Sequence, residues 1–319
     1  MHTVIIGGTG HIGTYLVPRL ILAGHEVSIV ARNPKPQYVK PDRIWESVNW
    51  IVADRRAEEK AGTWSERMAS IEADVVVDLL AFSPEESQLM IDAFRGRIDH
   101  FLHCGTIWSY GETLRAPYEE HFPRNPSTDI GAAKAQIEAD LISAWRHDDF
   151  PATVVHPGHI SGRYWLPIDP QGSRDGVGVY EKLARGDTVH LPDLGLATLH
   201  HVHADDVAQI FQRAIENPKA SLGESFSAVA DYAMSLLGCC RFVASLFGRE
   251  ANIAFVTLPE LHEIVGEESF EIIESHVTHS PCSSNAKAKR LLGFTPRFTA
   301  EEIFAESIDH LLQTGQLVI

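Results

Sequence analysis

Three regularly spaced glycines near the N-terminus carry the clearest chemical signal in this chain. Residues 4–13 read V-I-I-G-G-T-G-H-I-G, with Gly7, Gly10 and Gly13 directly after an apolar run. In a strand–turn–helix unit, such glycines permit a tight turn, a close approach to a pyrophosphate, and close packing of helix against sheet. The helix N-terminus then offers free N–H groups and a partial positive charge to phosphates. The spacing therefore predicts a dinucleotide-binding turn.

The end of the second expected strand indicates which dinucleotide is bound. Dinucleotide folds place an Asp or Glu there to bond the ribose 2′-OH of NAD, whereas an Arg suits the 2′-phosphate of NADP. This chain has Arg32 at that point and no acid beside it. We therefore expect NADP, with NAD as the alternative. Asp54, after the third expected strand, is a candidate acceptor for the adenine amino group. For both residues a plain solvated charge is the competing interpretation.

The elements that must position these residues follow from the alternation of short apolar runs with helical segments. The expected strands are 3–6, 27–30, 48–52, 74–80, 100–104 and 153–156, and the expected helices are 12–23, one starting at Ser83-Pro84, and 132–145. This pattern indicates a parallel sheet covered on both faces. We expect an α/β, Rossmann-type doubly wound domain over 1–158, to which later segments return. Residues 159–319 mainly form a smaller substrate-binding lobe.

Composition excludes several classes of protein. The chain has 319 residues and a formal net charge of −16. This charge disfavours nucleic-acid backbones and anionic membrane surfaces, and no apolar run approaches the roughly 20 residues of a membrane span. The four cysteines show no zinc spacing, and reduced thiols are the simplest interpretation. With no signal-peptide pattern at the N-terminus, we expect a cytoplasmic protein with a small-molecule substrate.

Several further segments resemble one known family. F-L-H-C-G-T-I-W-S-Y-G at 101–111 resembles a strand that carries a catalytic Ser or Thr, and H-P-G-H-I-S-G at 156–162 resembles an R-P-x-x-x-x-G segment. The segments 117–120 (P-Y-E-E), 201–208 (H-V-H-A-D-D-V-A) and 284–296 (S-N-A-K-A-K-R-L-L-G-F-T-P) resemble later parts of the same family. With the glycine turn, and in this order, the chain resembles the extended short-chain dehydrogenase/reductase family, in its NAD(P)-dependent epimerase/dehydratase group.

The resemblance implies a catalytic set from which one member is missing. In that family a Tyr gives or takes the substrate proton, a Lys lowers the pKa of that Tyr and holds the nicotinamide ribose, and a Ser or Thr bonds the substrate oxygen. The Ser/Thr position falls on Thr106 and the Lys position on Lys134. The Tyr position, four residues before the Lys, is Ile130. An isoleucine side chain neither donates nor accepts a proton.

Three explanations of Ile130 stay open. In the first, another group is the acid, and the candidates are Lys134, His159, Tyr110, Tyr118 and Tyr164. A desolvated lysine can have a lowered pKa, and a histidine suits proton transfer near neutral pH. In the second, the reaction needs no strong acid or the substrate supplies it. In the third, the protein binds its cofactor without turnover, as a regulatory or scaffold protein, since a fold does not fix a function.

The resemblance also implies the cofactor contacts and a mode of assembly. The residues that correspond to cofactor contacts are Gly7, Thr9, Gly10, His11, Ile12, Gly13, Arg32, Asp54, Leu80, Ala81, Lys134, Pro157 and Gly158. The resemblance implies Thr106 and Lys134 as catalytic residues, and His159 is added to them from the candidate acids. The reaction would be hydride transfer to or from a carbon that bears oxygen, on a sugar-like or other small polar metabolite. Segments 84–95 and 132–145 are candidate homodimer faces.

Two polar clusters invite other interpretations, which the sequence does not favour. His200, His201 and His203 look like metal ligands, but successive strand residues point to opposite faces, and no Cys or carboxylate stands at zinc-site spacing. We therefore expect no metal site. Asp205 and Asp206 precede an apolar helical run, so a helix N-cap and a first-turn charge are the expected roles.

The cofactor expectation leads to a binding prediction. The purified protein, titrated separately with NADPH and NADH and followed by fluorescence, should bind NADPH more tightly, because Arg32 can pair with the 2′-phosphate. A reversed preference would remove the role of Arg32 and keep the redox interpretation. Failure to bind either dinucleotide would contradict both.

Overall fold

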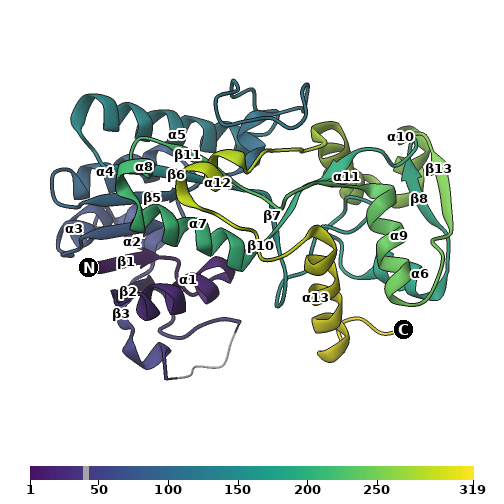
Figure 1. The fold of residues 1–319 in the computed structure, drawn as a ribbon, viewed down its shortest axis with the longest axis horizontal. Coiled ribbons are helices and arrows are strands. Elements are labelled where there is room, and N and C mark those ends of the chain that lie inside the picture. The colour runs from purple at the N-terminus through teal and green to yellow at the C-terminus, as the bar shows by residue number, and fades with distance from the viewer. Residues whose placement is uncertain (39–42) are drawn as a thin grey trace.

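The computed structural model describes residues 1–38 and 43–319, and a seven-stranded parallel sheet forms its larger half (Figure 1). The strands are β1 (His2–Ile6), β2 (Glu26–Ala31), β3 (Asn49–Val52), β4 (Val75–Asp78), β5 (His100–Cys104), β6 (Ala152–Pro157) and β11 (Ser225–Ala228). Their order across the sheet is β11-β6-β5-β4-β1-β2-β3, and every neighbouring pair is parallel. The expected Rossmann-type doubly wound fold is confirmed.

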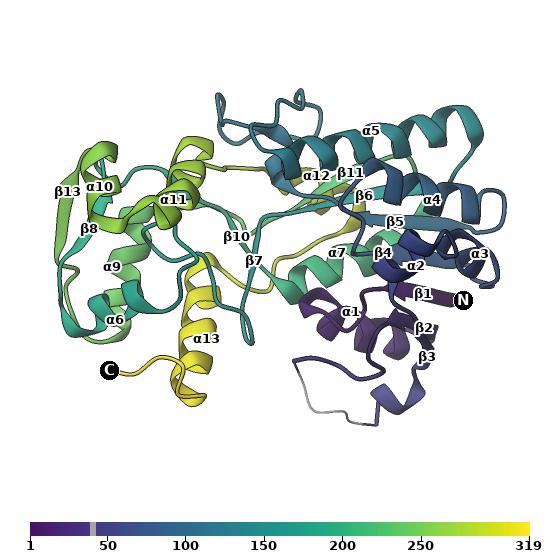
Figure 2. The ribbon, with the colours of Figure 1, turned by 180° about the vertical axis from the view of Figure 1, so that it is seen from behind.

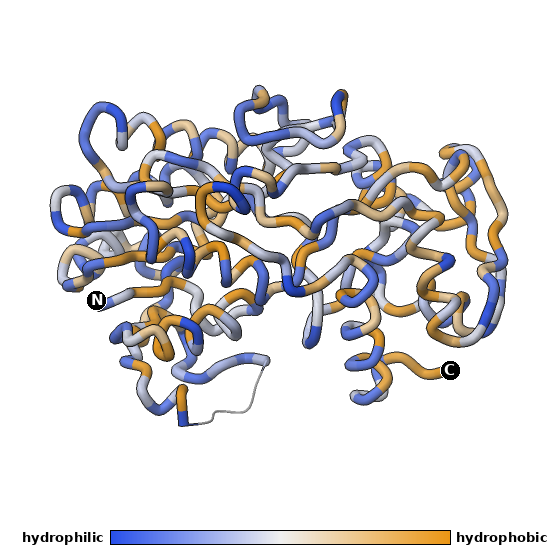
Figure 3. Tube along the Cα trace, in the orientation of Figure 1, coloured by the Kyte–Doolittle hydropathy of each residue, from blue (hydrophilic) through white to orange (hydrophobic). Residues whose placement is uncertain are grey.

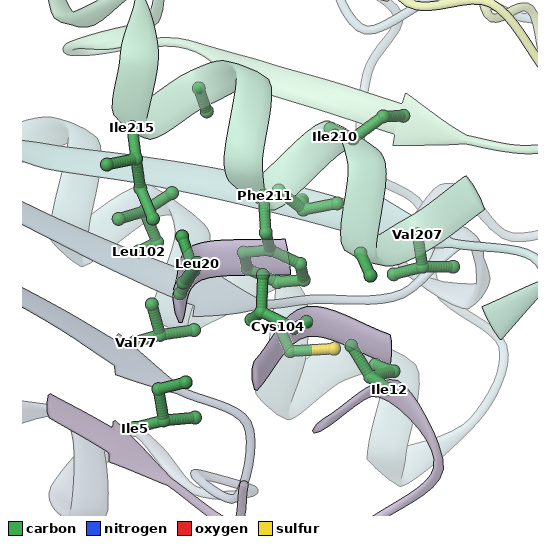
Figure 4. Packing of buried hydrophobic residues seen from close by; sticks show 14 of the residues in the cluster. Ile5, Ile12, Leu20, Val77, Leu102, Cys104, Val207, Ile210, Phe211 and Ile215 are labelled. Carbon is green, nitrogen blue, oxygen red and sulfur yellow. The ribbon is translucent and has the colours of Figure 1, made fainter. Parts of the chain in front are cut away.

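Helices cover both faces of this sheet because its strands are apolar on both. One face carries α1 (His11–Leu22), α7 (Ala204–Glu216) and α12 (Ala286–Leu292), and the other carries α3 (Trp64–Ala69), α4 (Pro84–Phe94) and α5 (Asp129–Asp148). Within β1, Ile5 belongs to the first core cluster, and Val4 and Ile6 belong to the second, as the two-residue period of a strand requires. Figure 4 shows the first cluster, with Phe211 of α7 among the labelled side chains.

Two element boundaries differ from those expected, and both differences matter for the site. The helix expected at 132–145 begins at Asp129, because the Thr128 hydroxyl caps it by accepting a hydrogen bond from the Gly131 N–H. Ile130 therefore lies in the first helical turn. The strand expected at 74–80 ends at Asp78, whose carboxylate accepts the Leu80 N–H and turns the chain out of the sheet.

The second half of the chain builds a smaller lobe and also returns to the sheet (Figure 2). The lobe contains β8 (Val189–Pro192), β9 (Thr198–Leu199), β12 (Met234–Ser235), β13 (Ile253–Val256), α6 (Gly178–Arg185), α9 (Leu236–Leu246), α10 (Leu258–Val265), α11 (Glu267–His279) and α13 (Ala300–Gln313). Its core is a separate apolar cluster that includes Tyr180, Val243 and Phe304. A parallel pair, β7 (His159–Ser161) and β10 (His201–His203), links the two halves. Apolar stretches recur along the chain in both halves (Figure 3).

The remaining short elements complete the frame. They are α2 (Arg55–Ala61), α8 (Pro218–Ser221) and two 3-10 helices, η1 (Trp45–Ser47) and η2 (Ile107–Tyr110). Residues 165–177 form a long irregular loop before α6, as their glycine and proline content indicates. Across the described residues, no helix is both long enough and apolar enough to cross a membrane.

The glycine turn between β1 and α1 depends on one close approach of backbone to backbone. A Cβ atom at Gly13 would lie 2.1 Å from the Gly8 carbonyl oxygen, so the first turn of α1 packs directly on the preceding loop. Backbone atoms cannot move aside as the end of a flexible side chain can. The third glycine of the pattern is therefore required by packing.

Gly13→Ala should lower the free energy of unfolding by about 3 kcal/mol, because overpacking against backbone forces the turn to shift. Urea unfolding measures the change. Gly178→Ala is the matched control, since a Cβ there meets nothing within 4 Å, and it should change stability by less than about 1 kcal/mol. Equal effects of the two substitutions would contradict the packing argument.

Candidate active site

The N-terminus of α1 is built to receive an anion. Gly10 is its N-cap and supplies no side-chain cap, and the first turn contains no acidic residue. The first N–H groups of a helix have no intrahelical partners, so here they stay available. A Cβ at Gly7 would lie 2.6 Å from Cγ of Leu80, so a side chain there would displace Leu80. This turn fits a dinucleotide pyrophosphate.

A loop from the smaller lobe contacts the same turn. The His11 Nε2 atom lies 2.9 Å from the Arg163 carbonyl oxygen, and its ring stacks on Trp165 with centroids 5.4 Å apart. Burial lowers the pKa of His11 to about 4, so the ring is neutral near pH 7. The positive potential at the turn therefore comes from backbone N–H groups.

The two residues expected to select and orient the adenosine half lie on the surface. Arg32 directly follows β2 and is exposed. Asp54 caps α2 by accepting a hydrogen bond from the Ala57 N–H at 3.2 Å. This cap is a structural role that the sequence did not indicate, and the expected adenine contact stays a prediction.

An ion pair that sequence reasoning missed fixes the chain beyond β4. Arg55 Nη1 donates to both carboxylate oxygens of the fully buried Asp78, at 3.0 Å each, and Nη2 donates to the Glu86 carbonyl. Because Asp78 also accepts the Leu80 N–H, this pair sets the path of Leu80 and Ala81. The available signal was an acid at the end of an otherwise apolar strand.

The Lys134 amine lies where the ends of β4 and β5 meet α5. Its Nζ atom donates to the carbonyl oxygens of Ala81 and Cys104, both at 2.6 Å, and lies 3.5 Å from Nε2 of His103. The side chain is buried, and desolvation lowers its pKa. Ile130 lies one turn earlier on α5 and is 63% exposed, so it is an apolar residue at the surface near this amine.

A buried network holds the backbone of Thr106. The Thr106 N–H donates to Nδ1 of His156 at 3.1 Å, and Nε2 of His156 lies 3.1 Å from a carboxylate oxygen of Glu138. Arg124 donates to both Glu138 oxygens at 2.6 Å. Burial opposes ionisation of Glu138, but His156 and Arg124 outweigh it and hold its pKa below its usual range. The sequence signal was Glu138 itself, four residues after Lys134 on the same helix face.

Of the candidate acids, only His159 lines the cavity that it shares with the loop before α6. It lies in β7, and its ring centroid is 6.0 Å from that of Trp108, two residues after Thr106. Burial, and then the nearby His276 and His201, lower its pKa well below 6.5. His159 is thus neutral near pH 7, with one donor and one acceptor nitrogen in its ring.

The three tyrosines occupy structural positions. Tyr110 and Tyr118 pack on each other with centroids 4.5 Å apart, inside a small apolar cluster, and burial raises the pKa of both. Tyr164 lies in the loop after β7 and packs on His310 of α13. None of the three is among the residues that line the cavity beside His159.

Pro157 and Gly158 connect the sheet to β7. Pro157 ends β6, and the Gly158 N–H donates to the Ala228 carbonyl of β11. A Cβ at Gly158 would lie 2.3 Å from the His200 carbonyl oxygen. This close approach positions His159 at the edge of the cavity.

The histidines at 200–203 contact different groups and do not converge on one point. His200 contacts the Ala230 carbonyl, and His203 Nε2 lies 2.6 Å from Glu306. The described residues contain no group of three potential ligands placed to hold a metal ion. The expected N-cap role of Asp205 and Asp206 was wrong. The N-cap of α7 is His203, whose Nδ1 accepts the Asp205 N–H. Asp205 and Asp206 do lie in the first turn of α7.

Comparison with known proteins places this geometry in context. A family model described as "NAD dependent epimerase/dehydratase family" matches residues 3–228. The chain is 22% identical to the chloroplast stem-loop binding protein of 41 kDa b of Arabidopsis thaliana, over 95% of this chain and 77% of that protein.

Two solved structures show the same fold over nearly the whole chain. A UDP-glucose 4-epimerase of Thermotoga maritima, solved with UDP-glucose, is similar with a TM-score of 0.74 at 20% identity, covering 98% of this chain and 99% of that one. A UDP-glucuronic acid 4-epimerase of Bacillus cereus, solved with NAD, is similar with a TM-score of 0.73 at 17% identity and the same coverage.

Glu138→Gln tests the network beneath Thr106 through its dependence on pH. Because the folded-state pKa of Glu138 is depressed below 4.5, its stabilisation is fully present above the unfolded pKa and is lost as the pH falls through the folded pKa. The variant should be less stable than the parent by about 2 kcal/mol at pH 7, with a difference that narrows in acid. Urea unfolding at several pH values measures it.

The control is an exposed ion pair. The side chains of Arg95 and Asp148 are 42% and 48% exposed, so Asp148→Asn should lower the free energy of unfolding by less than about 1 kcal/mol. A Glu138→Gln difference that is independent of pH would mean that the carboxylate is not held charged by its partners.

Proposed function

Because this chain belongs to the NAD dependent epimerase/dehydratase family, and is an enzyme of that family, we propose that it transfers hydride between an NAD(P) dinucleotide and a carbon that bears oxygen on a small metabolite. Thr106 orients the substrate oxygen. Lys134 gives and takes the substrate proton, because position 130 holds an isoleucine and not a tyrosine. NADP is the preferred dinucleotide, since Arg32 follows β2 without an acid beside it.

The position of the Lys134 amine carries this proposal. Two carbonyl oxygens accept two of its three N–H bonds. The third has only the distant Nε2 atom of His103, at 3.5 Å, which a ribose or a substrate oxygen would replace as acceptor. Desolvation lowers its pKa, which brings the group closer to the range in which it can both give and take a proton.

Burial also separates the roles of Lys134 and His159. The pKa of His159 is held well below 6.5, so near pH 7 its ring carries no proton to give as a cation. Burial lowers the pKa of Lys134 from an ordinary value of 10.5, so of the two groups it is the one that holds an acidic proton. We assign Lys134 as the proton donor. His159 forms a hydrogen bond with the substrate.

The remaining residues bind and position. The bound cofactor supplies the hydride. The turn from Gly7 to Gly13 binds its pyrophosphate through backbone N–H groups, and Lys134 holds the nicotinamide ribose. The His156–Glu138 pair fixes the Thr106 backbone through one hydrogen bond, so that the hydroxyl stands at a defined place for the substrate oxygen.

Assembly, location and nucleic-acid binding stay proposals that follow from the sequence. A homodimer through α4 and α5 remains the expectation from the resemblance, although polar pairs, Gln88–Asp92 and Gln136–Asp140, mark the exposed faces of these helices. Four unpaired cysteines suit a cytoplasmic enzyme. One relative is named for stem-loop binding, but a net charge of −16 opposes a phosphate backbone here.

Lys134→Met should reduce kcat about 10³-fold, because it removes the proton donor. Thr106→Ala should reduce kcat/KM about 10²-fold through loss of the bond to the developing charge on oxygen. NAD(P)H absorbance measures turnover with carbonyl and hydroxyl compounds found by screening. The decline in rate at high pH should belong to Lys134 and should be absent from the residual activity of Lys134→Met.

Lys60→Met, an exposed lysine on α2, is the control and should leave the kinetics unchanged. Full turnover by Lys134→Met, with cofactor affinity and thermal stability intact, would contradict the assignment of the proton donor.

A further inference from the structure

A cavity of about 320 Å³ lies between the cofactor turn and the smaller lobe. Its lining residues are His159, Ile160, Trp165, Leu166, Ile168 and Arg174. Trp165 stacks on His11 at the start of α1, and the His159 ring packs near Trp108, two residues beyond Thr106. The cavity therefore joins the dinucleotide turn to the segment that carries the proposed catalytic threonine.

Arg174 gives this cavity a charge without a protein counter-ion. Among the described residues, no carboxylate forms an ion pair with its guanidinium, a property that Arg174 shares with several other arginines of the chain. Arg174 is exposed to solvent and lines the cavity, so its guanidinium is available to a ligand that enters from solvent. An anionic group of a ligand would stabilise that charge through paired hydrogen bonds.

The other polar group of the lining is a neutral ring with an unused nitrogen. His159 is 4% exposed, and its Nε2 atom has no hydrogen-bond partner among the described residues. Behind it lie His276 and His201, with ring centroids 4.9 and 5.6 Å away, which are also neutral because burial lowers their pKa values. A buried nitrogen of this kind is normally satisfied. Because the His159 ring lines the cavity, a rotation of the ring would bring a nitrogen to a hydroxyl or carbonyl oxygen of a ligand.

The rest of the lining is apolar and limits what else the ligand can be. The side chains of Ile160, Leu166 and Ile168 are hydrocarbon, and Trp165 presents an indole that is 43% exposed. A sugar ring buries several hydroxyl groups and needs a polar partner for each, and this lining provides two polar side chains. The net charge of −16 also makes a multiply charged ligand less favourable than a singly charged one.

We propose that the substrate, given the hydride-transfer function above, is an apolar molecule with one anionic group and one hydroxyl or carbonyl group. Arg174 binds the anionic group, His159 bonds the oxygen, and the hydrocarbon body lies against Ile160, Leu166 and Ile168. The anion is a carboxylate or a phosphate monoester. This substrate class differs from the sugar nucleotides named for the similar solved structures.

The test is a binding titration of the full chain saturated with NADP, followed by calorimetry. The probes are phenyllactate and hydroxydecanoate as apolar acids, their methyl esters as uncharged matches, phenethyl phosphate as the phosphate form, and gluconate and UDP-glucose as polar anions. Arg174→Gln removes the proposed anion contact and Arg174→Lys keeps a charge. Arg146→Gln, an exposed arginine at the far end of α5, is the control.

At least one apolar acid should bind, and its ester should bind at least about tenfold more weakly, since a charged hydrogen bond is lost. Arg174→Gln should weaken binding of the acid by a similar factor and leave binding of the ester unchanged. Arg174→Lys should recover part of the affinity for the acid, and Arg146→Gln should have no effect on either affinity. Leu166→Asn should weaken binding of the apolar acids and leave binding of gluconate unchanged. Comparison of the carboxylate and phosphate probes identifies the anion.

Tighter binding of UDP-glucose or gluconate than of every apolar acid would overturn the proposal, as would no binding of any apolar acid. Those results leave the hydride-transfer function standing, because saturation with NADP is measured first in the same sample. Failure to bind either NADP or NAD at that first step would instead overturn the proposed function.

Discussion

The buried ammonium group of Lys134 is the constraint around which this site is organised. A charged amine can be buried only when its N–H bonds find acceptors, and here the acceptors are the carbonyls of Ala81 and Cys104. These carbonyls belong to the chain just beyond β4 and to the last residue of β5, so α5 must dock where both strands end. The Arg55–Asp78 pair makes this possible by fixing the turn that presents Ala81. One side chain thus sets the relation of a helix to two strands at the sheet edge where such folds bind ligands.

Burial without counter-charges determines the chemistry of the surrounding histidines. His103 beside Lys134, His159 at the cavity, and His276 behind it all have pKa values below 6.5, with desolvation as the largest cause. These rings bond as neutral groups. Lys134 and Arg174 carry positive charge without forming an ion pair to a described carboxylate, and in the proposed function they serve the catalytic and the recognition side of the site. This separation gives one cation to the proton chemistry and one to the binding of an anion.

The sequence predicted those features that local pattern determines. Glycine spacing identified the turn because the close approach at Gly13 and the positive φ at Gly7 are demands on single residues. Apolar runs that alternate with helical segments identified the sheet because its central strands are buried on both faces. The Glu138–His156 contact joins positions 18 residues apart, and Arg55–Asp78 joins positions 23 residues apart. Such pairings depend on which strand ends and helices become neighbours. The cap roles of Asp54 and His203 were missed for a related reason, because a polar residue before a helix can serve as a cap, a ligand or a solvated charge.

The isoleucine at position 130 has a physical consequence beyond the absence of a proton donor. Ile130, Leu80 and Phe82 are 63%, 41% and 53% exposed, so apolar side chains are concentrated around the approach to Lys134. The Phe82 ring centroid lies 4.5 Å from the Lys134 amine, close enough for a cation–π interaction. An apolar rim keeps water from solvating the amine and so maintains the desolvation that lowers its pKa. A tyrosine at position 130 would bring a hydroxyl to this rim. Under the proposed function, an isoleucine at position 130 therefore favours a lysine that exchanges the proton in place of a tyrosine.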